Sequence, residues 1–261
     1  MSGVEAQESA SEQQAVDKTD QEFLQHTAVI IPAQNEAKSI ELVLHDLPEV
    51  GCVIVVDNGS NDGTGELAEA AGALVVREEI AGYGQACLTG IAHLEQVAAS
   101  LKNGPDYVAF LDADYSDYPE RLSDLVRPIH EGEYDFVLGS RLLGEREKGA
   151  MPPQSVYGNK LAVALIRMFW GYSFTDLGPF RAIHRDSLTE LKMNDRNFGW
   201  TVEMQIKAVV NKLRIKEVPV PYRCRVGTSK ISGTISRTIQ ADYKILYTIA
   251  RYRWLTRNGV N

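Results

Sequence analysis

The chain has 261 residues with 44% hydrophobic and 24% charged side chains and a formal net charge of −8, the composition of a globular protein with one large domain or two small ones. No apolar stretch reaches the roughly 18 residues of a membrane span, and the polar, acidic N-terminus lacks the apolar segment of a signal peptide. The three cysteines are scattered without a C-x-x-C pair. We therefore expect a cytoplasmic protein with reduced thiols and no zinc site.

Charge is unevenly distributed along the chain. Residues 1–27 hold six acidic groups against Lys18 and few large apolar side chains, so we expect a disordered tail. Residues 205–261 hold twelve Lys or Arg against Glu217 and Asp242. This basic region favours an anionic partner such as phosphates or a membrane surface, although a solvated helix face would have the same composition. No RNA- or DNA-binding motif accompanies these charges, so we expect no nucleic-acid partner.

The first half of the chain alternates short apolar segments with helical patterns. This alternation predicts an α/β domain with a mostly parallel, Rossmann-like sheet and helices on both faces. Ligands of such sheets bind beyond the carboxyl ends of the strands, so polar residues at those ends are candidates for a site. In chain order, the expected strands are residues 28–32, 52–57, 73–77 and 107–112, and the expected helices are residues 36–47, 65–71, 85–101 and 118–129.

The second half is less regular. We expect a single domain over residues 28–233, with a nucleotide-binding half up to about residue 115 and an acceptor half from residue 116, followed by a basic amphipathic helix over residues 234–261. Its expected strands are residues 136–140, 179–184 and 215–220, and its expected helices are residues 156–170, 200–212 and 235–254.

The most informative segment is residues 107–114, YVAFLDAD, where a buried-strand pattern ends in two aspartates one residue apart. Alternation along an extended chain places Asp112 and Asp114 on the same side, so both carboxylates can face one ion. Hard divalent cations such as Mg²⁺ or Mn²⁺ take carboxylate oxygens and substrate phosphates as ligands. The pair is a candidate mount for a metal that carries a nucleotide diphosphate, whereas a D-x-D met alone is more often a turn that caps the next helix.

Three further motifs follow the preceding expected strands. Residues 32–36 (PAQNE) open a helix, whose N-terminus attracts anions. Residues 57–64 (DNGSNDGT) form a glycine-rich turn in which Asp57 could accept a hydrogen bond from a base. Each of these two motifs could also be a simple helix cap. Residues 81–86 (AGYGQA) contain G-x-G after the third strand rather than the first, so we interpret them as a backbone passing close to a ligand and not as an NAD site.

Together, these motifs resemble a known family over residues 28 to about 244. The matching pieces are IIPAQNEA, VIVVDNGSNDGT, GYGQA and FLDAD, and they are similar to family 2 glycosyltransferases of the GT-A fold. LGSR (residues 138–141), DLGPFRAI (176–183) and RVGTSKISG (225–233) most resemble the polyprenyl or dolichyl phosphate mannosyl- and glucosyltransferases. The resemblance implies a metal-dependent, inverting transfer of a hexose from a UDP- or GDP-sugar.

The resemblance also implies roles for individual residues. Asp112 and Asp114 would hold Mg²⁺ or Mn²⁺ on the sugar-nucleotide diphosphate. In the polyprenyl phosphate enzymes a glutamine two residues further on helps to bind the metal, and Ser116 occupies that position here. The nucleotide pocket would consist of Pro32, Ala33, Asn35, Glu36, Asp57 and Gly84. The donor and acceptor phosphates would be bound by Arg141, Arg181, Arg225, Ser229 and Lys230.

The chemistry of the acceptor decides whether a base is needed. The metal and arginines such as Arg141 would stabilise the departing nucleoside diphosphate while the acceptor attacks C1 of the sugar. A phosphate acceptor is already an anion and needs no base, whereas a hydroxyl acceptor does. Asp176 and Glu203 are the carboxylates available for that role. Asp176 could instead hold a turn or a phosphate-binding arginine, and Glu203 could be a surface residue of a helix.

The favoured acceptor is a polyprenyl or dolichyl phosphate at the cytosolic face of a membrane. Residues 161–172 (LAVALIRMFWGY) and the last helix, with Arg237, Lys244, Arg251 and Arg253, combine apolar, aromatic and basic side chains as membrane interfaces do. The same pattern fits ordinary core or an interface between copies of the chain, so a homo-oligomer is also compatible with the sequence.

Two other functions stay open at this point. One is transfer to a soluble hydroxyl or phospho-acceptor. The other is a sugar-nucleotide-binding protein without turnover, against which the intact Asp112 and Asp114 pair argues. A dehydrogenase would carry G-x-G-x-x-G after the first strand, and a nucleotidyltransferase would carry a glycine-rich loop with Arg or Lys there; IIPAQNEA has neither.

Overall fold

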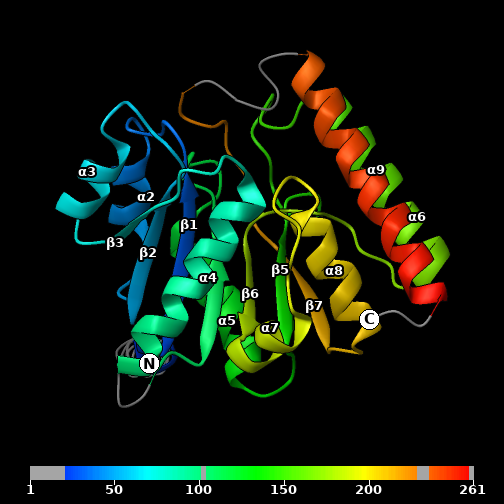
Figure 1. The fold of residues 1–261 in the computed structure, drawn as a ribbon, viewed down its shortest axis with the longest axis horizontal. Helices are drawn as coiled ribbons and strands as arrows, with labels where there is room; N and C mark the ends of the chain where they lie inside the picture. The colour runs from blue at the N-terminus through cyan, green and yellow to red at the C-terminus, as the bar shows by residue number, and fades with distance from the viewer. Residues whose placement is uncertain (1–20, 101–103, 228–234, 259–261) are drawn as a thin grey trace, which may run out of the picture.

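Seven strands form one sheet in the order β3-β2-β1-β4-β6-β5-β7 (Figure 1). The computed structural model describes residues 21–100, 104–227 and 235–258. The elements of the first half are β1 (Thr27–Ala33), α2 (Ile40–Asp46), β2 (Cys52–Asp57), α3 (Thr64–Ala70), β3 (Leu74–Arg77), α4 (Tyr83–Ser100), β4 (Tyr107–Phe110), a 3₁₀ turn (Pro119–Arg121) and α5 (Leu122–His130). Those of the second half are β5 (Phe136–Ser140), α6 (Pro153–Trp170), β6 (Arg181–His184), α7 (Arg185–Leu191), α8 (Trp200–Val210), β7 (Ile215–Pro219) and α9 (Ile235–Arg257).

The strand directions gather several carboxyl ends at one edge of the sheet. Strands β1 to β4 are mutually parallel, β5 is parallel to β7, and β6 runs antiparallel to both β4 and β5. In the register of the sheet, Ala33 lies beside Asp57 and Phe110 lies beside Ile30. The chain leaving β4 therefore emerges next to the ends of β1 and β2, where ligands of parallel sheets bind.

Two apolar layers cover the sheet, as the alternation of its strand side chains requires. Ile30 packs into a cluster with residues of α4, α6, α7, α8 and α9, whereas its neighbours Val29 and Ile31 pack with residues of α2, α3 and α5. The central strands β4 and β5 are buried at every position, while the edge strand β3 is partly exposed. The predicted α/β fold with helices on both faces is thus confirmed.

Helices α6 and α9 lie side by side at one end of the molecule, beyond α8 (Figure 1). Ile249 and Tyr252 of α9 join the apolar cluster under α8, so α9 is part of the same domain. Among the residues described, none of the helices is sufficiently long and apolar to cross a membrane.

Most element boundaries agree with the sequence prediction to within a few residues, and the differences have local causes. Helix α7 was not predicted, because its seven residues RDSLTEL are short and mostly polar. The folded region also begins before residue 28, since Phe23 and Leu24 are buried in the core. The expected disorder of residues 1–20 lies outside the described residues.

Candidate active site

A cavity of about 420 Å³ opens at the carboxyl ends of β1, β2 and β4. Its walls come from segments that are far apart in the sequence: the ends of these strands, the start of α4, the loop before α8 and the segment after β7. The lining residues are Pro32, Ala33, Gln34, Glu36, Asn58, Ala81, Gly82, Tyr83, Ala86, Asp112, Ala113, Asp114, Asn197, Phe198 and Arg225. The predicted residues Pro32, Ala33, Glu36, Asp112 and Asp114 are therefore brought together.

Asp112 and Asp114 both line this cavity, but their carboxylates differ in hydrogen bonding. The Oδ1 atom of Asp112 is buried and has no hydrogen-bond partner. Burial, reinforced by the charge of neighbouring Asp114, raises the pKa of Asp112 to about 7. Asp114 accepts hydrogen bonds from the backbone N–H of Ser116 at 3.0 Å and from its hydroxyl at 2.5 Å. Ser116 thus orients Asp114, and the Ser116 hydroxyl is engaged in that hydrogen bond.

A divalent cation fits this acidic pair. An unpartnered buried carboxylate oxygen is costly unless something positive or a donor binds it. Asp112 lines the cavity, and its Oδ1 is such an atom. Across the described ranges, no cluster of three or more His, Cys, Asp or Glu side chains is arranged to hold a metal. Two protein carboxylates with the remaining ligands from substrate phosphates and water match the usual binding of Mg²⁺.

Arg225 closes one side of the cavity by joining two carboxylates. Its guanidinium lies 2.7 Å from Glu36 Oε1 and 3.2 Å from Asp114 Oδ2. Backbone hydrogen bonds from Arg223 N to Ser116 O and from Val226 N to Asp114 O fix this segment to the acidic loop. Arg225, which the sequence resemblance assigned to phosphate binding, therefore forms an ion pair with Asp114 of the acidic pair.

Three of the residues predicted for the nucleotide pocket lie beside the cavity lining and not on it. Asp57 is buried and accepts a hydrogen bond from the backbone N–H of Ser60, which stabilises the turn after β2. The side chain of Asn35 accepts from the backbone N–H of Asn61 in the same turn. A Cβ atom on Gly84 would lie 2.1 Å from the carbonyl oxygen of Asp195. The G-x-G motif therefore allows a close approach of another loop of the same chain.

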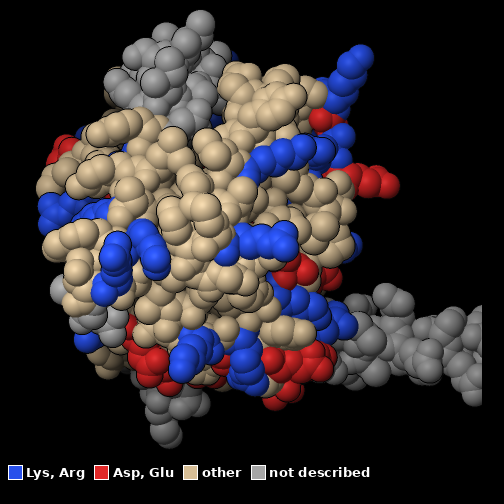
Figure 2. Space-filling model, turned by 90° about the vertical axis from the view of Figure 1, so that its right-hand side faces the viewer, with Lys and Arg blue, Asp and Glu red and all other residues tan. Residues whose placement is uncertain are grey.

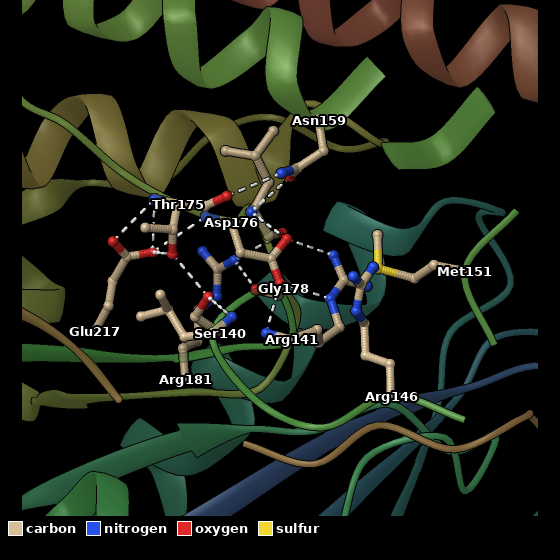
Figure 3. A network of polar contacts seen from close by, with 12 residues as sticks. Ser140, Arg141, Arg146, Met151, Asn159, Thr175, Asp176, Gly178, Arg181 and Glu217 are labelled. Atoms are coloured by element: carbon tan, nitrogen blue, oxygen red, sulfur yellow. Dashed lines mark hydrogen bonds and ion pairs between the residues drawn. The ribbon is translucent and has the colours of Figure 1, made fainter. Parts of the chain in front are cut away.

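A network behind the acidic pair ties β5, β7 and the segment before β6 together (Figure 3). Arg141 binds Asp176 in a bidentate manner, with Nε 2.7 Å from Oδ2 and Nη2 2.8 Å from Oδ1. Burial alone would raise the pKa of Asp176, but the paired guanidinium holds this pKa below its ordinary value. Glu217 in turn accepts hydrogen bonds from the backbone N–H groups of Thr175 and Asp176. Asp176 is thus committed to Arg141.

Arg181 is fully buried, and its guanidinium faces the chain's own carbonyl groups. It donates to the carbonyl oxygens of Thr201, Leu177 and Gly178. Burial lowers the pKa of Arg181 to about 10. The structure therefore does not bring Arg181 to the cavity as a phosphate-binding group, and its observed contacts join the segment before β6 to α8.

Glu203 is also fully buried and lies away from the cavity lining. Its carboxylate accepts hydrogen bonds from the backbone N–H groups of Asn194 and Asp195 and from the hydroxyl of Tyr252. Lys207 forms an ion pair with it at 2.8 Å. A carboxylate with these partners is poorly placed to act as a base on an acceptor. Ser229 and Lys230 lie outside the described residues.

The cavity also contains residues that sequence reasoning missed. Tyr83 lines it, with a buried hydroxyl next to Asp112, and so do Asn197 and Phe198. Asp117, just behind, is buried with both carboxylate oxygens unpartnered. Nothing in the sequence after the acidic pair marks Asp117 as a buried carboxylate, and residues 197–198 carry no motif.

Comparison with known proteins decides the family. A profile described as "Glycosyl transferase family 2" matches residues 28–192, which is more than half of the chain. The chain belongs to glycosyltransferase family 2. The matched region contains the acidic pair and all of the cavity walls except the loop at residues 197–198 and Arg225.

This family 2 chain is similar to several named proteins. It is 33% identical to the low-salt glycan biosynthesis hexosyltransferase Agl6 of Haloferax volcanii over 79% of this chain, but it spans only half the length of that relative. It is 30% identical to the polyprenol monophosphomannose synthase of Mycolicibacterium smegmatis, with 85% of this chain and 86% of the relative covered.

The fold is also found among solved structures. The glucosyl-3-phosphoglycerate synthase of Mycobacterium tuberculosis, crystallised with Mn²⁺, UDP-glucose and phosphoglyceric acid, superposes with a TM-score of 0.67. The match covers 90% of this chain and 80% of that one, at 23% sequence identity. The predicted GT-A fold is therefore confirmed, and the profile match agrees with the family that the sequence motifs resemble.

Proposed function

We propose that this glycosyltransferase moves a hexose from a UDP- or GDP-sugar to a polyprenyl or dolichyl phosphate and uses Mg²⁺ or Mn²⁺. The observation that carries the proposal is the unpartnered Oδ1 of Asp112 beside Asp114 on a cavity at the carboxyl ends of the strands. The similarity to a relative named polyprenol monophosphomannose synthase supports the acceptor class.

Asp112 and Asp114 would hold the metal, which would neutralise charge on the diphosphate as it leaves. Pro32, Ala33 and Glu36 line the same cavity and would contact the nucleotide. An oxygen of the acceptor phosphate attacks C1 of the sugar, the bond from C1 to the β-phosphate oxygen breaks, and the nucleoside diphosphate leaves with the electron pair. The configuration at C1 inverts.

No general base is required in this scheme, because the acceptor phosphate is already an anion. This agrees with the contacts of the two carboxylates that could have served as bases: Asp176 is bound to Arg141, and Glu203 is bound to backbone N–H groups. Arg225, which pairs with Asp114, would bind phosphate oxygens once a metal replaced it there, and Arg141 would contribute its positive charge from behind the acidic pair.

The outer faces of α6 and α9 are suited to contact with the membrane that holds such an acceptor. Helix α6 and residues 243–258 contain no acidic residue, although the chain as a whole is acidic. Figure 2 shows basic side chains among uncharged ones across this end of the molecule, with acidic ones mainly towards its lower edge. The exposed apolar side chains here include Tyr157, Leu161, Met168, Tyr243, Tyr247 and Trp254.

The proposal is tested by transfer from radiolabelled UDP-glucose and GDP-mannose, each supplied with Mn²⁺ and one acceptor. The acceptors are a polyprenyl phosphate in detergent and phosphoglyceric acid. We expect butanol-extractable label only with the polyprenyl phosphate, and none after addition of EDTA. Label on phosphoglyceric acid alone would identify a soluble phospho-acceptor. Nucleotide binding without transfer to either acceptor would favour a binding protein without turnover.

A further inference from the structure

One wall of the cavity is a loop that has little secondary structure of its own. Asn197 and Phe198 of this loop line the cavity together with the acidic pair. The same loop supports the start of α4, because Gln85 N donates a hydrogen bond to Arg196 O at 2.9 Å. A Cβ atom at Gly82 would lie 2.2 Å from Arg196 O, so the loop and the α4 start are in close contact. A shift of the loop would therefore move two walls of the cavity together.

The loop is held from behind by α8. Glu203 accepts from Asp195 N at 2.7 Å and from Asn194 N at 3.1 Å, and Asp195 accepts from Asn197 N at 2.8 Å. These bonds fix the backbone immediately before the residues that face the cavity. Charged acceptors form stronger hydrogen bonds to N–H groups than neutral acceptors do.

The final helix completes this support. Tyr252 of α9 donates its hydroxyl to Glu203 at 2.5 Å, and Lys244 of α9 lies 3.1 Å from Asp195 Oδ2. Thr248, between them on the helix, is so close to Gly199 that a Cβ atom there would lie 2.2 Å from the threonine hydroxyl. Three successive turns of α9 thus contact the two carboxylates and the glycine that shape the loop.

We infer that Tyr252 and Lys244 are positioning residues for the donor site: through Glu203 and Asp195 they hold residues 194–198 as a wall of the cavity. Helix α9 is then a component of the donor site, although none of its described residues lines the cavity. Glu203, which the sequence analysis considered as a catalytic base, holds the loop in this scheme and does not contact the acceptor. The inference rests on the proposed function for the identity of its ligand.

The test compares Tyr252→Phe with Tyr107→Phe. Both tyrosines are buried, and each substitution removes one hydroxyl hydrogen bond. The hydroxyl of Tyr107 bonds to His130 at the start of β4, whereas the acidic pair follows the end of that strand. Lys244→Gln is a second variant in case Tyr252→Phe folds poorly. Amide hydrogen exchange of residues 194–198 and Gln85 is measured without ligand. The Kd values for UDP-glucose and GDP-mannose are then measured with Mn²⁺, and transfer kinetics with the better donor.

We expect Tyr252→Phe and Lys244→Gln to accelerate exchange at residues 194–198, and to raise the donor Kd and KM about three- to tenfold with little change in kcat. Tyr107→Phe should leave exchange at the loop and donor affinity as in the wild type. Unchanged exchange in both α9 variants, or equal loosening in Tyr107→Phe, would overturn the inference. If the wild type bound neither sugar nucleotide, the proposed function would fail, and the exchange data alone would still decide whether α9 holds the loop.

Discussion

The acidic pair at the cavity and the arginine network behind it both contain buried aspartate oxygens, but these oxygens differ in whether they have hydrogen-bond partners. Asp112 has a buried oxygen without a partner, whereas both oxygens of Asp176 accept hydrogen bonds, two of them from the Arg141 side chain. The first carboxylate has a pKa raised by burial, and the second has a pKa lowered by its cation. Asp112, with its unsatisfied oxygen, lines the cavity, whereas the satisfied carboxylate of Asp176 does not.

This difference separates binding from support. A buried charge without a partner destabilises the native state and is retained where a ligand can bind it. A buried ion pair that is fully hydrogen-bonded holds segments in place, and its disruption leaves an uncompensated charge. Substitution at the cavity should therefore affect transfer more than stability, and substitution in the network should affect stability first.

The largest effect is expected for Asp176→Asn. The amide cannot neutralise Arg141, whose side chain is 14% exposed, and its NH₂ group would face N–H donors. We expect a loss of about 3–5 kcal/mol in the free energy of unfolding. Urea denaturation followed by circular dichroism measures this loss.

The matched control is Asp135→Asn. Asp135 accepts hydrogen bonds from the backbone N–H, Nε and Nη2 of Arg214, the same three groups through which Arg141 binds Asp176. The side chain of Arg214, however, is 55% exposed. We expect a cost of about 1 kcal/mol or less there. Equal costs for the two substitutions would contradict the distinction between a buried support and a solvated ion pair.

Asp112→Asn should show the reverse pattern. The neutral amide removes an unpartnered buried charge and its repulsion with Asp114, so the melting temperature should be equal or higher. Transfer should fall by at least about 100-fold, because metal stabilisation of the leaving group is worth several kcal/mol. Transfer at the wild-type rate would show that Asp112 does not hold the metal.

Asp117 provides a test of the same comparison in which the effect on stability depends on pH. Burial raises the pKa of Asp117 well above its ordinary value, and its oxygens have no partner. The unfolded chain then loses its proton at lower pH than the native state, so this group costs stability as the pH rises above about 4. Asp117→Asn should stabilise by about 1 kcal/mol at pH 7 and by little at pH 4. A gain of the same size at both pH values would rule out titration of Asp117 as the cause.

The smallest effect is expected for Arg225→Gln. The guanidinium occupies the carboxylate that a metal would use, so its removal should raise the affinity for Mn²⁺ alone by about fivefold, as expected for loss of an ion pair of about 1 kcal/mol. Affinity for the sugar nucleotide should fall, because a phosphate-binding cation is lost. Isothermal titration calorimetry with Mn²⁺ and then with nucleotide separates the two steps. Weaker binding of Mn²⁺ alone would mean that Arg225 supports the metal site and does not compete with it.

The fold could be predicted well because its central strands are continuous apolar runs that end in turn residues. Residues 52–57 and 136–140 were predicted with the bounds that the structure has. Helix α7 could not be found in this way, since packing on α8 and β6 and not its polar sequence stabilises it. Tertiary contacts also extend α4 to Tyr83, two residues before the predicted start.

The site could be predicted where it depends on strand ends, and not where it depends on burial. Asp112, Asp114 and Glu36 reach the cavity because parallel strands end at one edge. The sequence does not reveal that Arg181 faces its own backbone carbonyls, because an arginine in such a motif is equally suited to phosphate. Phe198 is distant in sequence from the acidic pair and carries no motif of its own, so only the folded chain brings it to the cavity.

The most direct test of the central claim is a thermal-shift panel of UDP, GDP, CDP and their sugar conjugates, each with Mn²⁺ and with EDTA. A ligand that binds the native state raises the melting temperature by mass action. We predict a clear rise with one base, in the presence of Mn²⁺ only, and its loss in Asp112→Asn. A shift of the same size in EDTA, or an undiminished shift in Asp112→Asn, would contradict a metal-held diphosphate at this acidic pair.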